Sequence, residues 1–130
     1  MIDVPHADLA ELMSHRRNVA PGEIVFLEGQ PADCAFFILK GEVQVTTTDA
    51  HGNTVVINRM PAGELFGEIA LIGGDGRRTA TAQSKEGCEL LVIDKTVFAE
   101  RLAHADPLLR FVITHLARWV VMWTDRVRAV

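Results

Sequence analysis

The chain has 130 residues, of which 48% are apolar and 23% charged, a composition typical of one folded domain and not of a disordered segment. Its net charge is −4, so the chain lacks the overall positive charge that is usual in nucleic-acid-binding proteins. No apolar run is long enough to span a bilayer, including Trp119 to Trp123 in the last part of the chain. The N-terminus lacks the basic start and apolar stretch of a signal peptide, so we expect a cytoplasmic protein.

The first predicted element is a short helix from His6 to Arg17, because Leu9, Leu12 and Met13 recur at helical spacing. From residue 19 to residue 94, short apolar pieces alternate with turn residues. The pieces read EIVFLEG, CAFFILKG, EVQVTTT, TVVINRM, TATAQS and CELLVID, with a hairpin turn at 49–53. This spacing predicts an antiparallel β-barrel or sandwich over 19–94.

The chain becomes helical over 95–130, which gives an α+β fold. Asp94 is a candidate N-cap for a helix starting at Lys95, and Asp106-Pro107 is a specific start signal for a final helix. We expect one side of this final helix to pack on the barrel and another to need a partner. Its apolar residues lie at positions 109, 113, 116, 120, 123 and 127, with a second set at Phe111, Trp119 and Met122.

Metal and catalytic sites are not predicted. Cys34 and Cys88 lie far apart outside any CxxC motif, which favours free thiols. The five histidines are dispersed, and no nucleophile elbow, HExxH or Walker motif occurs. We therefore expect no metal, no cofactor and no enzyme activity.

The segment 65–82, LFGEIALIGGDGRRTATA, is unusual for a barrel because a helical turn and a glycine-rich loop interrupt the strands. Helix-start amides, glycines and arginine together suit an anionic phosphate. Glu68 is a poor phosphate ligand, but its carboxylate can accept a hydrogen bond from a sugar hydroxyl. Phosphate donors beside a sugar acceptor indicate a nucleotide site.

This segment resembles the phosphate-binding cassette of cyclic-nucleotide-binding domains, a family that includes sensor domains of bacterial catabolite activators and of cyclic-nucleotide-gated channels. The resemblance extends from the entry PGEIVFLEGQPAD through FFILKGEVQV and the cassette to the final helix. It implies one domain over 1–130 with an antiparallel jelly-roll barrel. It also implies a regulatory module that binds cyclic AMP or cyclic GMP.

The resemblance also implies a role for each cassette residue. Glu68 would bind the ribose 2′-OH, Arg78 would pair with the cyclic phosphate, and Thr79 would donate to the phosphate or the base. Arg77 competes for the arginine role, and the spacing from Gly67 favours Arg78. The full set of expected ligand-binding residues is Phe66, Gly67, Glu68, Ile69, Ala70, Arg78, Thr79 and Ala80.

The identity of the base and the residue that covers it stay open. Thr79 is compatible with either purine, and cyclic AMP is favoured because bacterial relatives mostly use it. In this family the final helix supplies the lid. Trp123 or Thr124 would cover the base in one alignment and Arg118 or Trp119 in another, or both tryptophans would fill a subunit interface.

The output is expected to pass through the final helix, either to a homodimer partner or to an effector protein. Because the sequence ends at Val130, we expect no helix-turn-helix and no direct DNA binding. The alternative hypothesis is a ligand-free dimerisation scaffold of the same fold.

Overall fold

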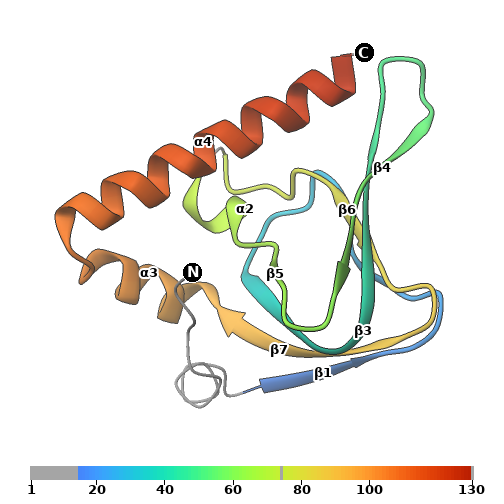
Figure 1. Cartoon of the computed structure of the whole chain (residues 1–130), viewed down its shortest axis with the longest axis horizontal. Coiled ribbons are helices and arrows are strands. Elements are labelled where there is room, and N and C mark those ends of the chain that lie inside the picture. The colour runs from blue at the N-terminus through green and yellow to red at the C-terminus, as the bar shows by residue number, and fades with distance from the viewer. Residues whose placement is uncertain (1–14, 74, 130) are drawn as a thin grey trace.

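The computed structural model describes residues 15–73 and 75–129 of the chain, whose strands curl into an antiparallel half-barrel with helices along one side (Figure 1). This confirms the predicted antiparallel barrel of the jelly-roll class. The strands are β1 (His15–Val19), β2 (Ile24–Phe26), β3 (Cys34–Thr48), β4 (Thr54–Pro61), β5 (Leu65–Phe66), β6 (Thr81–Gln83) and β7 (Cys88–Asp94). The helices are α2 (Ile69–Ile72), α3 (Lys95–Ala103) and α4 (Pro107–Ala129).

Strand β3 joins the two halves of the sheet. Its first half pairs with β7 and β5, and its second half pairs with β4 and β6. The sequence suggested two separate strands here, and the structure corrects this to one long strand that passes through Gly41. Gly41 has φ +89°, and a Cβ there would lie 2.5 Å from the Gly87 carbonyl oxygen, so only glycine fits this close approach.

The helix predicted for residues 6–17 is wrong for its last three residues, which belong to β1. Arg17 pairs with Leu90 of β7, and the Arg16 guanidinium forms a 2.9 Å ion pair with Glu89. Pairing with β7 satisfies the backbone of this segment, and this tertiary contact overrides the local helical periodicity. Residues 6–14 of the predicted helix lie outside the described residues.

The core lies on both faces of β3 and β7. The interior of the half-barrel holds the cluster Val19, Val25, Phe36, Ile38, Val43, Phe66, Ala82 and Leu90. On the opposite face, Ala35, Phe37, Leu91 and Ile93 are covered by side chains that include Leu71 of α2 and Phe98 of α3. Because both faces are buried, the segment CAFFIL is a continuous apolar run and not an alternating one.

Both predicted helix starts are confirmed. The Asp94 carboxylate accepts a 2.7 Å hydrogen bond from the Thr96 amide, and Asp106 accepts a 2.9 Å bond from the Leu108 amide. Each bond satisfies one of the amides that a helix start leaves without an intrahelical partner.

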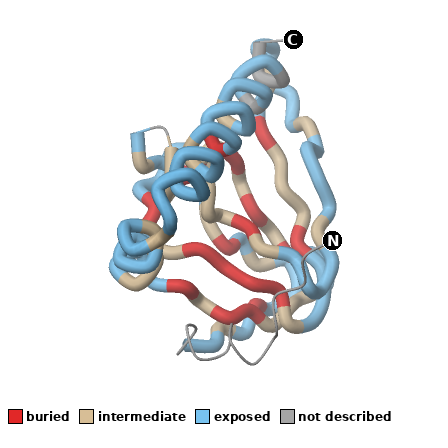
Figure 2. Tube along the Cα trace, turned by 60° about the vertical axis from the view of Figure 1, so that its left-hand side comes forward, coloured by how far each residue is buried: buried red, intermediate tan, exposed pale blue. Residues whose placement is uncertain are grey.

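Helix α4 packs against α2 and β3 through small side chains instead of its apolar stripe. Ala117 is only 2% exposed and packs beside Gly73, whereas the stripe residues Leu109 and Leu116 are exposed. Figure 2 shows α4 coloured as exposed along most of its length. Neither predicted apolar set is buried on the barrel, because the side of α4 that faces the domain is the side of Ala117. None of the described helices is long and apolar enough to cross a membrane.

Candidate functional site

A cavity of about 160 Å³ opens between the cassette, β4 and α4. All eight cassette residues that the sequence predicted as ligand-binding line it. The complete lining is Phe26, Val45, Ile57, Asn58, Met60, Leu65, Phe66, Gly67, Glu68, Ile69, Ala70, Arg78, Thr79, Ala80 and Val120. One cavity therefore brings together groups suited to phosphate, sugar and an apolar ring.

Gly67 sets the shape of the cassette at the start of α2. Its φ is +80°, and a Cβ at this position would lie 2.8 Å from Nη1 of Arg78. Its carbonyl oxygen accepts a 3.0 Å hydrogen bond from that same nitrogen. A larger residue would therefore strain the backbone and displace the arginine.

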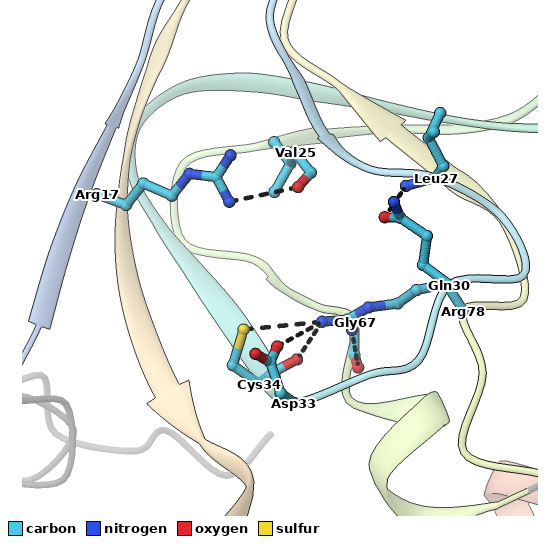
Figure 3. Close-up of polar contacts among 8 residues, drawn as sticks. All are labelled: Arg17, Val25, Leu27, Gln30, Asp33, Cys34, Gly67 and Arg78. Carbon is cyan, nitrogen blue, oxygen red and sulfur yellow. Dashed lines mark hydrogen bonds and ion pairs between the residues drawn. The ribbon is translucent and has the colours of Figure 1, made fainter.

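Arg78 is held rigidly at the inner wall of the cavity, although it is a charged residue that is only 5% exposed. Nη2 donates a 2.7 Å hydrogen bond to the Cys34 carbonyl oxygen (Figure 3). The guanidinium carbon lies 4.1 Å from the centre of the Phe26 ring. The nearest carboxylate, that of Asp33, is 4.0 Å away and almost fully exposed. The positive charge is thus weakly compensated, and burial lowers the pKa of Arg78.

The backbone of Arg78 is fixed by the neighbouring loop that follows β2. The Arg78 amide donates to the Gln30 carbonyl oxygen at 2.7 Å, and its own carbonyl accepts from the Gly29 amide at 2.8 Å. The Gln30 side chain in turn accepts from the Leu27 amide at 2.9 Å, as Figure 3 shows. This loop contact explains why a residue far along the sequence from β2 has one defined position.

Glu68 lines the cavity with a buried oxygen that has no partner. Among the described residues, none donates a hydrogen bond to Oε2 of this carboxyl group. Burial raises the pKa of Glu68, because the charged form loses solvation, and a backbone hydrogen bond partly opposes the shift. An unsatisfied buried acceptor costs about 1–3 kcal/mol, so a ligand hydroxyl at this point would relieve a real penalty.

The adjacent arginine, Arg77, does not line the cavity. Its guanidinium is exposed and donates to the Gly29 carbonyl oxygen at 3.0 Å, while its amide donates to Asp75 at 3.1 Å. The placement agrees with the preference for Arg78 that the sequence spacing indicated.

Three of the candidate lid residues, Arg118, Trp119 and Trp123, lie on α4 but outside the cavity lining. Arg118 is exposed, Trp119 donates its indole N–H to His115, and the Trp123 ring packs near Arg126. The side chain of Thr124 is outside the described residues. The α4 residue that lines the cavity is Val120, which the sequence analysis assigned only to the apolar stripe.

The wall opposite the cassette was also missed. Val45 and Met60 alternate with polar neighbours, so strand periodicity could have placed them inside the barrel. Ile57 and Asn58 are consecutive in β4, and no strand periodicity places both at one cavity.

Both cysteines are free thiols, as predicted. Cys34 Sγ lies 3.7 Å from Nη2 of Arg78, yet burial, with a contribution from Asp33, raises the pKa of Cys34 to about 11. The thiol therefore stays protonated at neutral pH and is a poor nucleophile. The described residues contain no group of side chains that could hold a metal ion.

The fold and this site define a small-ligand-binding domain of the cyclic-nucleotide type. The chain belongs to the cyclic nucleotide-binding domain family, whose model matches residues 16–105.

Named relatives include both cyclic-AMP and cyclic-GMP proteins. Over 98 residues the chain is 30% identical to the cAMP-activated global transcriptional regulator Vfr of Pseudomonas aeruginosa, covering 73% of this chain and 46% of that protein. Over 97 residues it is 31% identical to cGMP-dependent protein kinase 2 of Mus musculus, covering 74% of this chain and 13% of the kinase.

A solved structure supports the same assignment. The cAMP-bound form of the EAL enzyme Bd1971 has a TM-score of 0.76 and 28% identity, covering 82% of this chain and 28% of that chain. The chain thus spans less than half the length of each of these three proteins.

Proposed function

We propose that the domain binds a cyclic purine mononucleotide in the cassette cavity and acts as a sensor that relays binding through α4. The observation that carries the proposal is the meeting of a weakly compensated arginine and an unpartnered acceptor oxygen at one cavity. Arg78 supplies the first and Oε2 of Glu68 the second.

In the proposed complex, Arg78 pairs with the cyclic phosphate. A guanidinium has five N–H donors, and its bonds to Gly67 and Cys34 leave donors for an anion. The phosphate replaces distant, exposed Asp33 as the counter-ion of a buried charge. Glu68 accepts from the ribose 2′-OH, and Thr79 donates to the phosphate or the base.

The size of the cavity supports a role for α4 in signalling. Ligand pockets usually have volumes of roughly 300–1,000 Å³, whereas this cavity has about 160 Å³. A nucleotide would therefore contact or displace the part of the wall formed by Val120, and α4 carries that residue. Movement of a helix between two packed positions is an established way to relay binding.

Titration calorimetry with cyclic AMP and cyclic GMP tests the proposal. A ligand of about 22 non-hydrogen atoms at ~0.3 kcal/mol per atom predicts micromolar affinity. Arg78→Ala should weaken binding at least tenfold, because a charge-assisted hydrogen bond contributes about 1.5–3 kcal/mol. Wild-type protein that binds neither nucleotide would refute the proposal.

Arg77→Ala is the matched control, since it removes the same charge one residue away and outside the cavity. We expect it to change the dissociation constant less than threefold. Arg78→Lys covers the possibility of misfolding, because it keeps the charge and most of the volume. It should still weaken binding, since an ammonium lacks the planar fork of five donors with which Arg78 can hold two backbone carbonyls and still face a phosphate.

The alternative function is a ligand-free interaction scaffold, which the exposed apolar surface of α4 favours. The residues on this surface include Leu108, Leu109, Phe111, Leu116, Trp119 and Trp123. A contiguous apolar surface of this kind typically marks an interaction site. The scaffold predicts no binding heat with either nucleotide. A homodimer through α4 is compatible with both the sensor and the scaffold function. The cytoplasmic location stays a prediction.

A further inference from the structure

A second cavity, which we call the rear cavity, shares Arg78 and Phe26 with the cassette cavity but is otherwise lined by different residues. These come from β1, β2, the loop after β2 and the start of β3. The rear cavity has a volume of about 400 Å³, within the range of roughly 300–1,000 Å³ that is usual for small-ligand sites. Arg78, which is almost completely buried, therefore forms part of the wall of two cavities.

The rear cavity is lined by two guanidinium groups that come from distant parts of the sequence. Arg17 belongs to β1, and Arg78 lies between α2 and β6. Their guanidinium carbons lie 6.0 and 5.7 Å, respectively, from the centre of the Phe36 ring, so both charges are positioned beside one aromatic side chain. Figure 3 shows the Arg17 side chain extending from β1 toward Val25, and the Arg78 guanidinium beside Cys34.

The protein binds the Arg17 guanidinium only weakly. It donates to the Val25 carbonyl oxygen at 3.3 Å and to the Glu23 carboxylate at 3.2 Å. Charge-assisted hydrogen bonds between a guanidinium and a carboxylate are usually about 2.7–2.9 Å long, so both contacts are long. An oxyanion inside the cavity at the usual distance would therefore bind Arg17 more strongly than its present partners do.

Arg78 also keeps capacity for an acceptor on this side. Its Nη2 uses one N–H for the Cys34 carbonyl oxygen, and its other neighbours are the sulfur of Cys34 at 3.7 Å and the Asp33 carboxylate at 4.0 Å. Sulfur is a weak acceptor, and 4.0 Å is too long for a hydrogen bond. The charged groups among the described lining residues are Arg17, Arg78 and Asp33, so the lining is net positive. The Asp33 side chain is 92% exposed, and water weakens its attraction to the arginines.

We propose that the rear cavity binds a small oxyanion, with a carboxylate or phosphate group between the guanidiniums of Arg17 and Arg78, and that this anion weakens nucleotide binding in the cassette cavity. Both ligands would contact the same guanidinium, and their negative charges repel each other at short range. Because linkage is reciprocal, the nucleotide weakens anion binding by the same factor. The anion site does not require nucleotide binding, whereas the antagonism rests on the proposed function.

An NMR titration of isotope-labelled, nucleotide-free protein tests the site through the Nε–H signals of its arginines. Inorganic phosphate and succinate are the two probes, and they distinguish a phosphate site from a carboxylate site. We expect at least one probe to shift the signals of Arg17 and Arg78 together, with a dissociation constant on the order of 1 mM. Arg16 forms its ion pair with Glu89 outside the cavity, so its signal should not shift.

Arg17→Gln removes one guanidinium from the rear cavity without changing a residue that lines the cassette cavity. It should weaken anion binding at least fivefold. At constant ionic strength, a saturating anion should raise the calorimetric dissociation constant of the cyclic nucleotide about fivefold in wild type and less than twofold in Arg17→Gln.

Arg16→Gln is the matched control, because it makes the same change at the neighbouring exposed position of β1, and it should behave as wild type. Arg17→Lys covers the possibility that Arg17→Gln does not fold. It keeps the charge but lacks the planar fork, so it should still weaken anion binding about threefold or more.

Arginine signals that shift with neither probe would overturn the rear site. Antagonism that persists in Arg17→Gln would also overturn it, because the anion would then compete with the nucleotide at the cassette face of Arg78. Anion binding that leaves nucleotide affinity unchanged would overturn the antagonism alone. Anion binding by a protein that binds neither cyclic nucleotide would overturn the proposed function and leave the rear site intact.

Discussion

Glu68 is the cavity residue with the least satisfied side chain. Its Oε2 is buried without a partner among the described residues, and burial raises its pKa. The ligand-free domain thus carries a local penalty that a hydroxyl donor would remove. If Glu68 binds the ribose hydroxyl as proposed, function and stability are opposed at this residue, because the same side chain weakens the domain when no ligand is bound.

Glu68→Ala should weaken binding of the ribonucleotide about tenfold or more and leave its 2′-deoxy analogue within about threefold. The ribonucleotide alone has the hydroxyl that a charge-assisted bond would hold. Calorimetry of both ligands with wild type and variant gives the coupling free energy between the Glu68 side chain and the 2′-hydroxyl. Equal losses for both ligands would contradict the role in sugar binding.

The raised pKa adds a pH signature to the same prediction. Protonation removes the charge that strengthens the bond, so ribonucleotide affinity should fall as pH decreases from about 7 to 5, while the deoxy analogue responds less. The stability of the ligand-free domain should depend on pH in the opposite direction. Because the folded state binds this proton more tightly than the unfolded state, Glu68 contributes more stability at low pH. Glu68→Gln should abolish both trends.

Helix α4 depends on small side chains for its attachment to the rest of the domain. Ala117 is its buried point of contact, beside Gly73 at the end of α2. Since α2 carries the cassette and α4 carries Val120, this contact connects two walls of the cavity. A helix attached at such a narrow contact can change position without unpacking a large core.

Ala117→Leu should lower the free energy of unfolding by about 1–3 kcal/mol, because the added methylenes have no space between α4 and α2. Urea denaturation measures the change. Ala99→Leu, the same substitution at an exposed position of α3, should stay within about 0.5 kcal/mol. Equal stability of both variants would show that the contact with Gly73 is loosely packed. If α4 relays binding, Ala117→Leu should also change nucleotide affinity.

Charge and apolar surface are unevenly distributed over the domain. The chain has a net charge of −4, yet its last 24 residues contain four arginines and one aspartate. The same segment exposes most of the large apolar side chains of α4. A second copy of the chain could cover this surface.

That residues 1–130 form a single domain stays a prediction, since residues 1–14 lie outside the described residues.

Sedimentation velocity should show a concentration-dependent dimer of the wild-type protein. The double variant Phe111→Glu/Leu116→Glu should be monomeric, because it places charges in the apolar surface of α4. Ile24→Glu changes a similarly exposed apolar residue on β2 and should leave the dimer intact. Wild-type protein that stays monomeric at every concentration would exclude the homodimer and leave an effector protein as the partner.

Local patterns in the chain were sufficient for the class of fold, and the resemblance of segment 65–82 to a known cassette supplied the residues expected at the site. Alternating short strands, glycines at bends and the two aspartate caps each act over a few residues, so the sequence alone can indicate them. The cassette residues from Phe66 to Ala80 are close in the chain, and all eight predicted ligand residues line one cavity.

Long-range contacts decided the remaining features. Arg16 and Arg17 join a strand because β7 offers them a pairing edge, and Ala117 is the α4 residue that is buried, beside Gly73. Ile57 reaches the cavity beside Asn58 because β3 and β4 slip by one residue at a bulge. Hydrophobic periodicity predicts which side of an element is apolar. Packing between segments far apart in the sequence determines what contacts that side, and a local pattern cannot predict those contacts.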